Sequence, residues 1–202
     1  MRKDIRFVYF DLGRVVVDNE ASFDFLAQET GADIRQIIDF FDAHWKEACL
    51  GKISSIDHLE LLKKALNITT QAPDFADFWS EFHVPIKETV TLIDALSGRV
   101  KLGVLSNAEP GMFAKCIEKG KIPDPPWSSV VISSDVGSVK PERKIYEIAQ
   151  KRAKTASPHI FYIDDRPENI EVARRLGWES LLFVKEDIPS SIRKLRSALG
   201  LS

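Results

Sequence analysis

A run of β-branched and aromatic residues that ends in an aspartate constrains this fold more than any other stretch. Residues 7–10 read Phe-Val-Tyr-Phe, and Asp11, Leu12 and Gly13 follow. An apolar run without polar alternation is typical of a strand buried on both faces, as at the centre of a parallel sheet. Ligands bind outside the carboxyl ends of such strands. The sequence therefore places Asp11 where chemistry occurs, although an aspartate in a turn is also a common strand terminator.

The composition fits one α/β domain, with or without an insertion. The chain has 202 residues, 44% of them hydrophobic, and a formal net charge of -2. This balance gives no electrostatic case for binding nucleic acid or an anionic membrane surface. Cys49 and Cys116 both fall in helix-like apolar patterns, so neither a disulfide framework nor a zinc cluster is indicated. The first apolar run is too short for a signal peptide, and no stretch is long enough to span a bilayer, so a cytoplasmic protein is expected.

The rest of the chain predicts a helical insertion followed by alternating helices and strands. Residues 19–84 carry apolar side chains at helical spacing, with no strand-like segment. Further on, a helix is expected to start at Pro141. Strands are expected at 100–105, 130–132, 160–163 and 181–184. The fold class is therefore α/β, in which 1–18 and 85–202 form a Rossmann-like parallel sheet core flanked by helices. Residues 19–84 form an inserted all-helical cap beside Asp11.

Polar residues end three of these strands. They are Asp11, Ser106-Asn107 and Asp164-Asp165. The carboxyl ends of parallel strands meet at one edge of a sheet, so these side chains should converge. Clustered carboxylates stay ionised together only when a cation joins them, and a set of ligands with oxygen atoms alone suits Mg²⁺. Lys140 is the candidate for the further positive charge that a transferring phosphoryl group requires.

Each residue also has an ordinary interpretation when it is taken singly. Ser106 could be a turn residue, Lys140 could be solvated, and the paired aspartates could cap the helix that Pro167 opens. Two adjacent aspartates directly after an apolar strand are nevertheless more than a cap needs. The order of all these candidate residues along the chain therefore favours the functional interpretation.

Four ordered motifs resemble those of the haloacid dehalogenase (HAD) superfamily. They are Asp11-Leu12-Gly13, Ser106-Asn107, Lys140-Pro141 and the run from Asp164 to Asn169. The resemblance covers essentially the whole chain, and the helical block is similar to the small C1-type cap of subfamily IA. Each motif alone is short, but four in the right order at strand ends or helix starts are a strong signal. The chain looks most similar to sugar-phosphate phosphatases related to bacterial α-glucose-1-phosphate phosphatase, and to the N-terminal phosphatase domain of mammalian soluble epoxide hydrolase.

The resemblance implies roles for the residues that match the motifs. Asp11 would be the nucleophile that takes the phosphoryl group as an aspartyl phosphate, which splits hydrolysis into two steps. Ser106 would hydrogen-bond the phosphoryl oxygens, and Asn107 beside it would bind substrate. Lys140 would neutralise the phosphoryl group and fix the nucleophile.

The resemblance also implies a magnesium site, and two positions depart from the pattern. Asp11, the backbone carbonyl of Gly13 and Asp165 would hold the ion, with Asp164 acting behind them or through water. Gly13 stands where most of these phosphatases carry a second aspartate as general acid and base. Loss of such a group typically costs about 10²- to 10⁴-fold in rate, and less when the leaving group is acidic. Arg14 is the other departure, and it could contact the substrate or lie along the cap.

The resemblance thus implies a magnesium-dependent phosphatase that acts on a small phosphorylated metabolite such as a sugar phosphate. A haloacid dehalogenase is the alternative enzyme, but its chemistry needs no magnesium and would not favour the acidic pair Asp164-Asp165. A catalytically weak HAD-like binding or regulatory protein is the other alternative, which Gly13 and Arg14 support. The sequence predicts neither the metabolite nor the oligomeric state.

Overall fold

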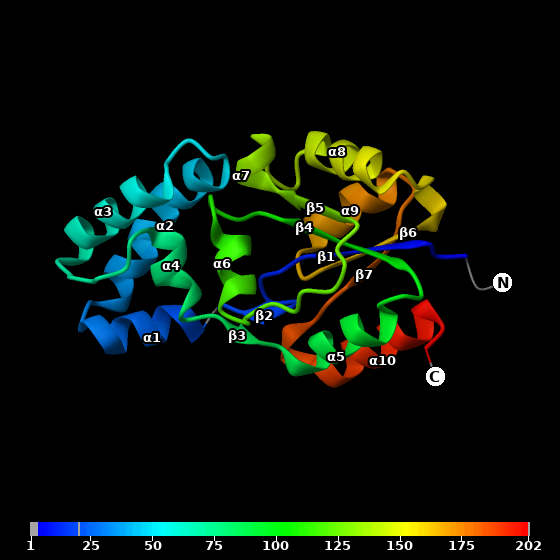
Figure 1. Cartoon of the computed structure of the whole chain (residues 1–202), viewed down its shortest axis with the longest axis horizontal. Coiled ribbons are helices and arrows are strands. Elements are labelled where there is room, and N and C mark those ends of the chain that lie inside the picture. Colours follow the sequence, from blue (N-terminus) through cyan, green and yellow to red (C-terminus); the bar gives the residue numbers. More distant parts are fainter. Residues whose placement is uncertain (1–3, 20, 202) are drawn as a thin grey trace.

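A five-stranded parallel sheet forms the centre of the protein (Figure 1). The structure is a computed structural model, and it describes residues 4–19 and 21–201. The strand order is β5-β4-β1-β6-β7. The strands are β1 (Phe7–Phe10), β4 (Lys101–Ser106), β5 (Ser129–Ile132), β6 (Ile160–Asp164) and β7 (Glu179–Leu182). The α/β class expected from the alternating pattern is confirmed.

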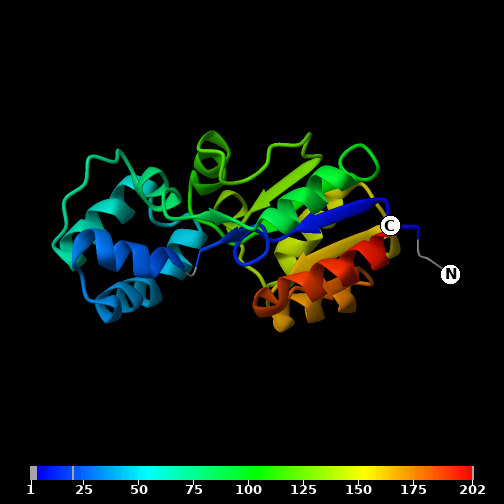
Figure 2. The same cartoon turned by 90° about the horizontal axis from the view of Figure 1, so that it is seen from below.

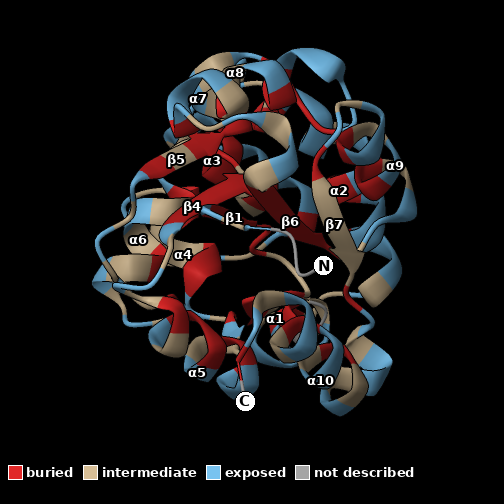
Figure 3. Ribbon diagram, turned by 90° about the vertical axis from the view of Figure 1, so that its right-hand side faces the viewer, coloured by how far each residue is buried: buried red, intermediate tan, exposed pale blue. Residues whose placement is uncertain are grey.

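Strand β1 is buried on both faces because it lies between β4 and β6, with helices above and below (Figure 3). Its side chains alternate between two hydrophobic clusters. Val8 and Phe10 join one cluster, and Phe7 and Tyr9 join the other. Alternate side chains of β1 point to opposite faces of the sheet, and each face is covered by a hydrophobic cluster. Every position of the strand is therefore apolar, which explains the unbroken apolar run in the sequence.

Helices cover both faces of the sheet (Figures 1 and 2). One face carries α7 (Ser133–Val136), α8 (Arg143–Ala153) and α9 (Pro167–Arg175). The other carries α5 (Lys87–Leu96) and α10 (Ile188–Leu199), and α6 (Met112–Glu118) packs into the same cluster nearer the cap. Two short 3-10 helices, η1 (Ser157–His159) and η2 (Lys185–Asp187), complete the core. No helix in the described ranges combines the length and the apolar character that crossing a bilayer requires.

The cap consists of four helices inserted between β1 and β4, at the end of the molecule away from both termini (Figures 1 and 2). They are α1 (Ala21–Thr30), α2 (Ile34–Cys49), α3 (Ser55–Leu66) and α4 (Phe75–Ser80). Side-chain oxygens of Asp33, Ser54 and Asp74 accept backbone N–H groups and start the last three helices. Two short antiparallel strands, β2 (Val17–Asp18) and β3 (Val84–Pro85), connect cap and core. The expected inserted helical cap is confirmed.

Three local features differ from the sequence-based expectations. The last strand, expected at 181–184, lies two residues earlier, at Glu179–Leu182. The helix expected to start at Pro141 begins at Arg143, because Lys140 and Pro141 lie in a turn and Glu142 has extended backbone as the N-cap. Strands β2 and β3 and the short helix α7 were not predicted. Each is two to four residues long, which is too short to show a hydrophobic period.

Candidate active site

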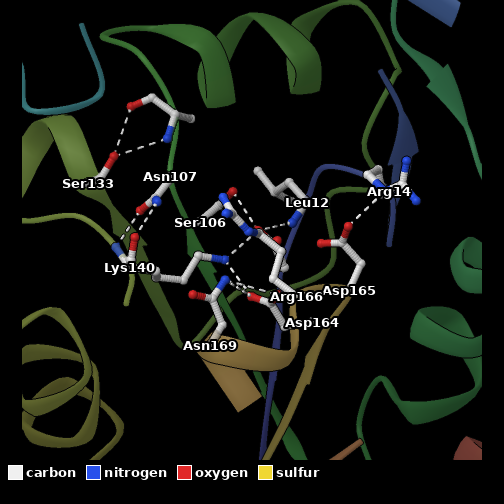
Figure 4. A network of polar contacts seen from close by, with 12 residues as sticks. Leu12, Arg14, Ser106, Asn107, Ser133, Lys140, Asp164, Asp165, Arg166 and Asn169 are labelled. Carbon is white, nitrogen blue, oxygen red and sulfur yellow. Dashed lines mark hydrogen bonds and ion pairs between the residues drawn. The ribbon is translucent and has the colours of Figure 1, made fainter. Parts of the chain in front are cut away.

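The strand order brings the polar strand ends together at one edge of the sheet (Figure 4). Because β1 lies between β4 and β6, Asp11 has Ser106 on one side and Asp164 on the other. Ser106 Oγ donates a hydrogen bond to Asp11 Oδ1 at 2.8 Å. One pocket of about 150 Å³ is bordered by Asp11, Ser106, Asn107, Lys140, Asp165 and Arg14. Asp164 does not line this pocket, but its Oδ2 lies 2.7 Å from Lys140 Nζ. The structure therefore assembles the residues that the sequence singled out.

Asp11 is buried and held through one of its two carboxylate oxygens. Oδ1 accepts hydrogen bonds from the Leu12 backbone N–H at 2.7 Å and from Ser106, and it pairs with Lys140 Nζ at 2.8 Å. All three contacts are made by Oδ1. Oδ2 takes part in none of them, so it is the oxygen that can attack a substrate. Burial raises the pKa of Asp11 to about 7, against the opposing effect of Lys140.

Lys140 is a buried cation at the centre of the site. Its Nζ contacts Asp11, Asp164 Oδ2 at 2.7 Å and the Tyr162 hydroxyl at 3.0 Å. Although burial opposes the charged form, the two carboxylates raise the pKa of Lys140 above its ordinary value. Asn107 fixes the lysine backbone twice: its Oδ1 accepts the Lys140 N–H at 2.8 Å, and its Nδ2 donates to the Lys140 carbonyl at 3.0 Å.

The two adjacent aspartates have different surroundings. Asp164 is fully buried and accepts hydrogen bonds from Asn169 Nδ2, the Arg166 backbone N–H and the Tyr162 hydroxyl. Burial opposes ionisation there, but Lys140 and these donors hold the pKa of Asp164 below its usual value. Asp165 is more accessible, and burial followed by the charge of Asp164 raises its pKa. Asp164 is therefore fixed in the core, whereas Asp165 faces the pocket.

The donor set fits a hard divalent cation. Asp11, Asp164 and Asp165 each offer one oxygen, and the three oxygens lie within 4.8 Å of one another. Magnesium is commonly bound through one or two carboxylates, waters and substrate phosphate oxygens. When all three carboxylates are ionised, their negative charge exceeds the positive charge of the two side chains that contact them, Lys140 and Arg14. Burial is the main cause of the raised pKa of Asp11, and the charges of Asp164 and Asp165 add to the rise.

Arg14 turns toward the acidic side of the pocket. Its Nε donates to Asp165 Oδ2 at 2.7 Å, and its Nη2 donates to Glu186 Oε1 at 2.8 Å. Its φ of 58° lies in the left-handed region, which favours glycine or asparagine over a long side chain. The sequence left two alternatives for Arg14, contact with the substrate or a position along the cap. The structure instead pairs its guanidinium with Asp165.

Three further residues belong to the site although the sequence did not single them out as site residues. Tyr162 and Asn169 bind Asp164, and the Asn19 amide packs against Gly13. Tyr162 could have been found, because residues two apart on a strand share a face. Asn169 lies in the first turn of α9, within the run that carries the family resemblance. Asn19 offered no sequence signal, since its position depends on how the chain enters the cap.

A comparison with known protein families decides the classification. A model of the haloacid dehalogenase-like hydrolases matches residues 20–183 of this chain. The chain belongs to that family. It is therefore a HAD-like hydrolase, as its ordered motifs indicated.

One relative with an assigned activity shares part of the sequence. The pyrimidine 5'-nucleotidase YjjG of Escherichia coli (strain K12) is 29% identical over 79 residues, which are 39% of this chain. The matched region spans 35% of the length of that relative. This likeness alone does not carry the substrate of the nucleotidase over to this HAD-like hydrolase.

Solved structures share the fold of this HAD-like hydrolase across nearly its whole length. A HAD family enzyme from Bacteroides thetaiotaomicron, in complex with magnesium and inorganic phosphate, has a TM-score of 0.73 at 17% identity and covers 90% of this chain and 95% of its own. A predicted HAD-like family hydrolase from Porphyromonas gingivalis has a TM-score of 0.72 at 24% identity and covers 96% of this chain and 98% of its own. The L-2-haloacid dehalogenase of Xanthobacter autotrophicus, with chloropropionic acid covalently bound, has a TM-score of 0.66 at 14% identity and covers 96% and 83%. At these identities the likeness establishes the fold alone.

Proposed function

We propose that this HAD-like hydrolase is a magnesium-dependent phosphatase of a small phosphorylated metabolite, with Asp11 as nucleophile. The observation that carries the proposal is the contact of Lys140 Nζ with both Asp11 and Asp164, beside a third carboxylate at Asp165. This arrangement suits an anionic phosphoryl group bound together with a cation. The magnesium and phosphate in the Bacteroides structure, and the nucleotidase activity of the Escherichia coli relative, are consistent with it.

The proposed reaction has two steps. Asp11 Oδ2 attacks phosphorus, the bond from phosphorus to the leaving-group oxygen breaks, and an aspartyl phosphate forms. The departing oxygen takes a proton from solvent. Water then attacks the same phosphorus and breaks its bond to Asp11 Oδ2, which releases the Asp11 carboxylate and inorganic phosphate, and the proton that the water loses passes to solvent. Ser106 and Lys140 hold the nucleophile through Oδ1, and Lys140 also supplies positive charge to the phosphoryl oxygens. Ser106 has a single hydroxyl hydrogen, so it donates to a phosphoryl oxygen only when it turns away from Asp11.

The magnesium ligands in this proposal are Asp11, the Gly13 carbonyl and Asp165, with Asp164 behind them. The ion would supply positive charge to the phosphoryl oxygens as charge develops on them. Asp165 is the one ligand whose carboxylate also pairs with Arg14. Binding of the ion therefore requires Arg14 to share or release this contact.

We also propose domain boundaries at 1–18 and 85–202 for the core and at 19–84 for the cap. The pairing of β2 with β3 supports them, because the chain leaves and re-enters the core through adjacent strands. Residues 1–3, 20 and 202 lie outside the described residues. A cap joined at one place could close over the pocket and exclude water during the reaction.

Phosphate release tests the proposed function. We expect the wild-type protein to hydrolyse p-nitrophenyl phosphate with magnesium and to lose this activity when EDTA removes the ion. A HAD-type dehalogenase would instead release halide from 2-chloropropionate without magnesium. Halide release with no phosphate release would contradict the proposal, and so would the absence of both from folded protein.

The leaving-group preference gives a second prediction. Because Gly13 supplies no general acid, we expect turnover of p-nitrophenyl phosphate to exceed that of glycerol phosphate by about 10²-fold or more. Installing the missing acid in Gly13→Asp should raise turnover of glycerol phosphate. A Cβ at position 13 would lie 3.2 Å from Asn19 Nδ2, so only this flexible amide must shift. Gly13→Ala is the matched control, and comparable wild-type turnover of the two esters would contradict the preference.

A further inference from the structure

Arg14 lies on a tight turn that follows β1. Its backbone N–H donates to the Val17 carbonyl at 2.7 Å, and the N–H groups of Val16 and Val17 donate to the Leu12 carbonyl at 2.8 and 3.0 Å. Both valines are buried. The φ of 58° at Arg14 is rare for a long side chain, and such a conformation persists only where its surroundings fix it. The turn therefore gives the Arg14 side chain a defined direction.

The Arg14 guanidinium joins two carboxylates that come from different loops. Its Nε donates to Asp165 Oδ2 at 2.7 Å (Figure 4), and its Nη2 donates to Glu186 Oε1 at 2.8 Å. The Asp165 side chain is 12% exposed, whereas that of Glu186 in η2 is 69% exposed. Because dissolved ions screen buried charges less, the contact with Asp165 is the less screened of the two. Glu186 offers the guanidinium a second partner at the surface.

The remaining charges of the site balance without Arg14 once a divalent cation is bound. Lys140 pairs with Asp11 and Asp164 at 2.8 and 2.7 Å, and Arg14 is the cation that pairs with Asp165 among the residues that the structure describes. When the three carboxylates are ionised, Lys140 leaves two negative charges uncompensated, which equals the charge of one magnesium ion. Two cations beside one carboxylate repel each other, so Arg14 opposes the binding of that ion.

We propose that Arg14 is a built-in counter-ion of Asp165, which competes with magnesium for this carboxylate and thereby sets the magnesium affinity of the site. The guanidinium neutralises Asp165 in the metal-free protein, and Glu186 receives it when the ion is bound. This inference rests on the proposed function, whose magnesium ligands include Asp165. The site then fills only at a higher magnesium concentration than its carboxylates alone would require, which makes the proposed activity responsive to free magnesium.

Magnesium binding in the absence of substrate tests this assignment, measured by isothermal titration calorimetry. Arg14→Gln keeps a long polar side chain and removes the charge. We expect it to bind magnesium about tenfold more tightly than the wild type at pH 8 and low salt, because the repulsion between the two cations is gone. The difference should shrink in high salt, since the Arg14 side chain is partly exposed. Equal or weaker binding by Arg14→Gln would overturn the assignment.

Arg14→Lys tests whether the charge is the cause. This variant retains a cation on the same turn, so it should bind magnesium less tightly than Arg14→Gln. Equal affinity of the two variants would show that the effect does not come from the charge and would overturn the assignment. Arg14→Asn, whose side chain suits the left-handed backbone, replaces Arg14→Gln if that variant does not fold.

Glu186→Gln tests the second partner of the guanidinium. We expect the magnesium affinity to fall about threefold, because the guanidinium is then held more strongly by Asp165. In the Arg14→Gln background the same change should have little effect, because Glu186 acts through Arg14. A loss of equal size in both backgrounds would show that Glu186 attracts magnesium directly, which would contradict its assigned part.

Thermal unfolding gives a readout that is independent of the calorimetry. In EDTA, Arg14→Gln should unfold at a lower temperature than the wild type, because the acidic cluster has lost a cation, and it should gain more from added magnesium. Arg143→Gln is the matched control, since Arg143 pairs with Glu147 on α8 at 2.7 Å and is 74% exposed. This control should show neither change and should keep the wild-type magnesium affinity.

Failure of this inference is distinguishable from failure of the proposed function. If the wild type and Arg14→Gln bind magnesium equally and the wild type releases phosphate, the assignment of Arg14 fails and the proposed function stands. If Arg14→Gln binds magnesium more tightly but the wild type releases no phosphate from p-nitrophenyl phosphate, the assignment stands and the phosphatase proposal fails. If neither protein binds magnesium, both fail.

Discussion

Asp11→Asn is expected to abolish phosphate release and, without magnesium, to make the protein more stable. The carboxamide cannot form the aspartyl phosphate, so kcat should fall at least about 10⁴-fold. The stability gain arises because Asp11 is buried with its pKa raised from 3.8 to about 7. Asparagine occupies the same volume without the cost of burying a charge.

The pH dependence of this gain follows from the direction of the pKa change. A carboxyl group with a raised pKa keeps its proton in the folded protein while the unfolded chain loses it. The contribution of Asp11 to stability therefore falls as the pH rises from about 4 to about 7, by a few kcal/mol, since one pKa unit corresponds to about 1.4 kcal/mol. Asp11→Asn lacks this loss, so the two proteins should be similar in stability near pH 4 and should differ most above pH 7.

Urea unfolding at pH 5 and pH 8 in EDTA measures this effect. The midpoint of the wild type should fall between the two pH values by more than that of Asp11→Asn, and added magnesium should narrow the difference. Asp24→Asn changes an exposed aspartate on α1 and should behave as the wild type does. A variant that is less stable than the wild type by the same amount at both pH values would show that Asp11 is not a destabilised buried carboxyl.

Lys140→Met is expected to damage both stability and catalysis. Methionine has a similar length but removes the cation that pairs with Asp11 and Asp164 inside the protein. Removal of one partner from a buried ion pair costs about 3–5 kcal/mol, because the charge left behind is uncompensated. The loss of a positioned charge at the phosphoryl oxygens should also lower kcat by about 10²- to 10³-fold or more.

A double variant separates the electrostatic cause from packing. In Lys140→Met combined with Asp164→Asn, one of the uncompensated carboxylates is gone, so part of the lost stability should return while activity stays low. Lys144→Met, at an exposed position on α8, is the matched control and should leave the midpoint of unfolding unchanged. Equal destabilisation in the single and the double variant would indicate that Lys140 contributes through packing rather than charge.

Much of the fold could be predicted because the signals that specify it are periodic. The apolar run of β1 requires neighbours on both sides, and this alone indicates a central parallel strand. The convergence of Asp11, Ser106 and Asp164 followed from their positions at strand ends. Helical spacing in the cap was visible for the same reason, since Phe41 and Trp79 bury one face of their helices.

The remaining features depend on contacts between distant segments, which leave no periodic pattern. The pairing of His58 in the cap with Glu109 in the core joins residues 51 positions apart, and each alone resembles a surface residue. The turn of Arg14 toward Asp165 depends on the left-handed backbone at position 14, and the position of Asn19 depends on the entry into the cap. These contacts therefore became visible only in the folded chain.

The covalent state of Asp11 during turnover is the most direct test of the proposed mechanism. The wild type would be mixed with magnesium and p-nitrophenyl phosphate, quenched in acid within the first turnover and mapped by peptide mass spectrometry. The account predicts a phosphoryl group on the peptide that contains Asp11, and none in Asp11→Asn or in the presence of EDTA. Phosphate release by the wild type with an unmodified Asp11 peptide, and undiminished release by Asp11→Asn, would contradict it.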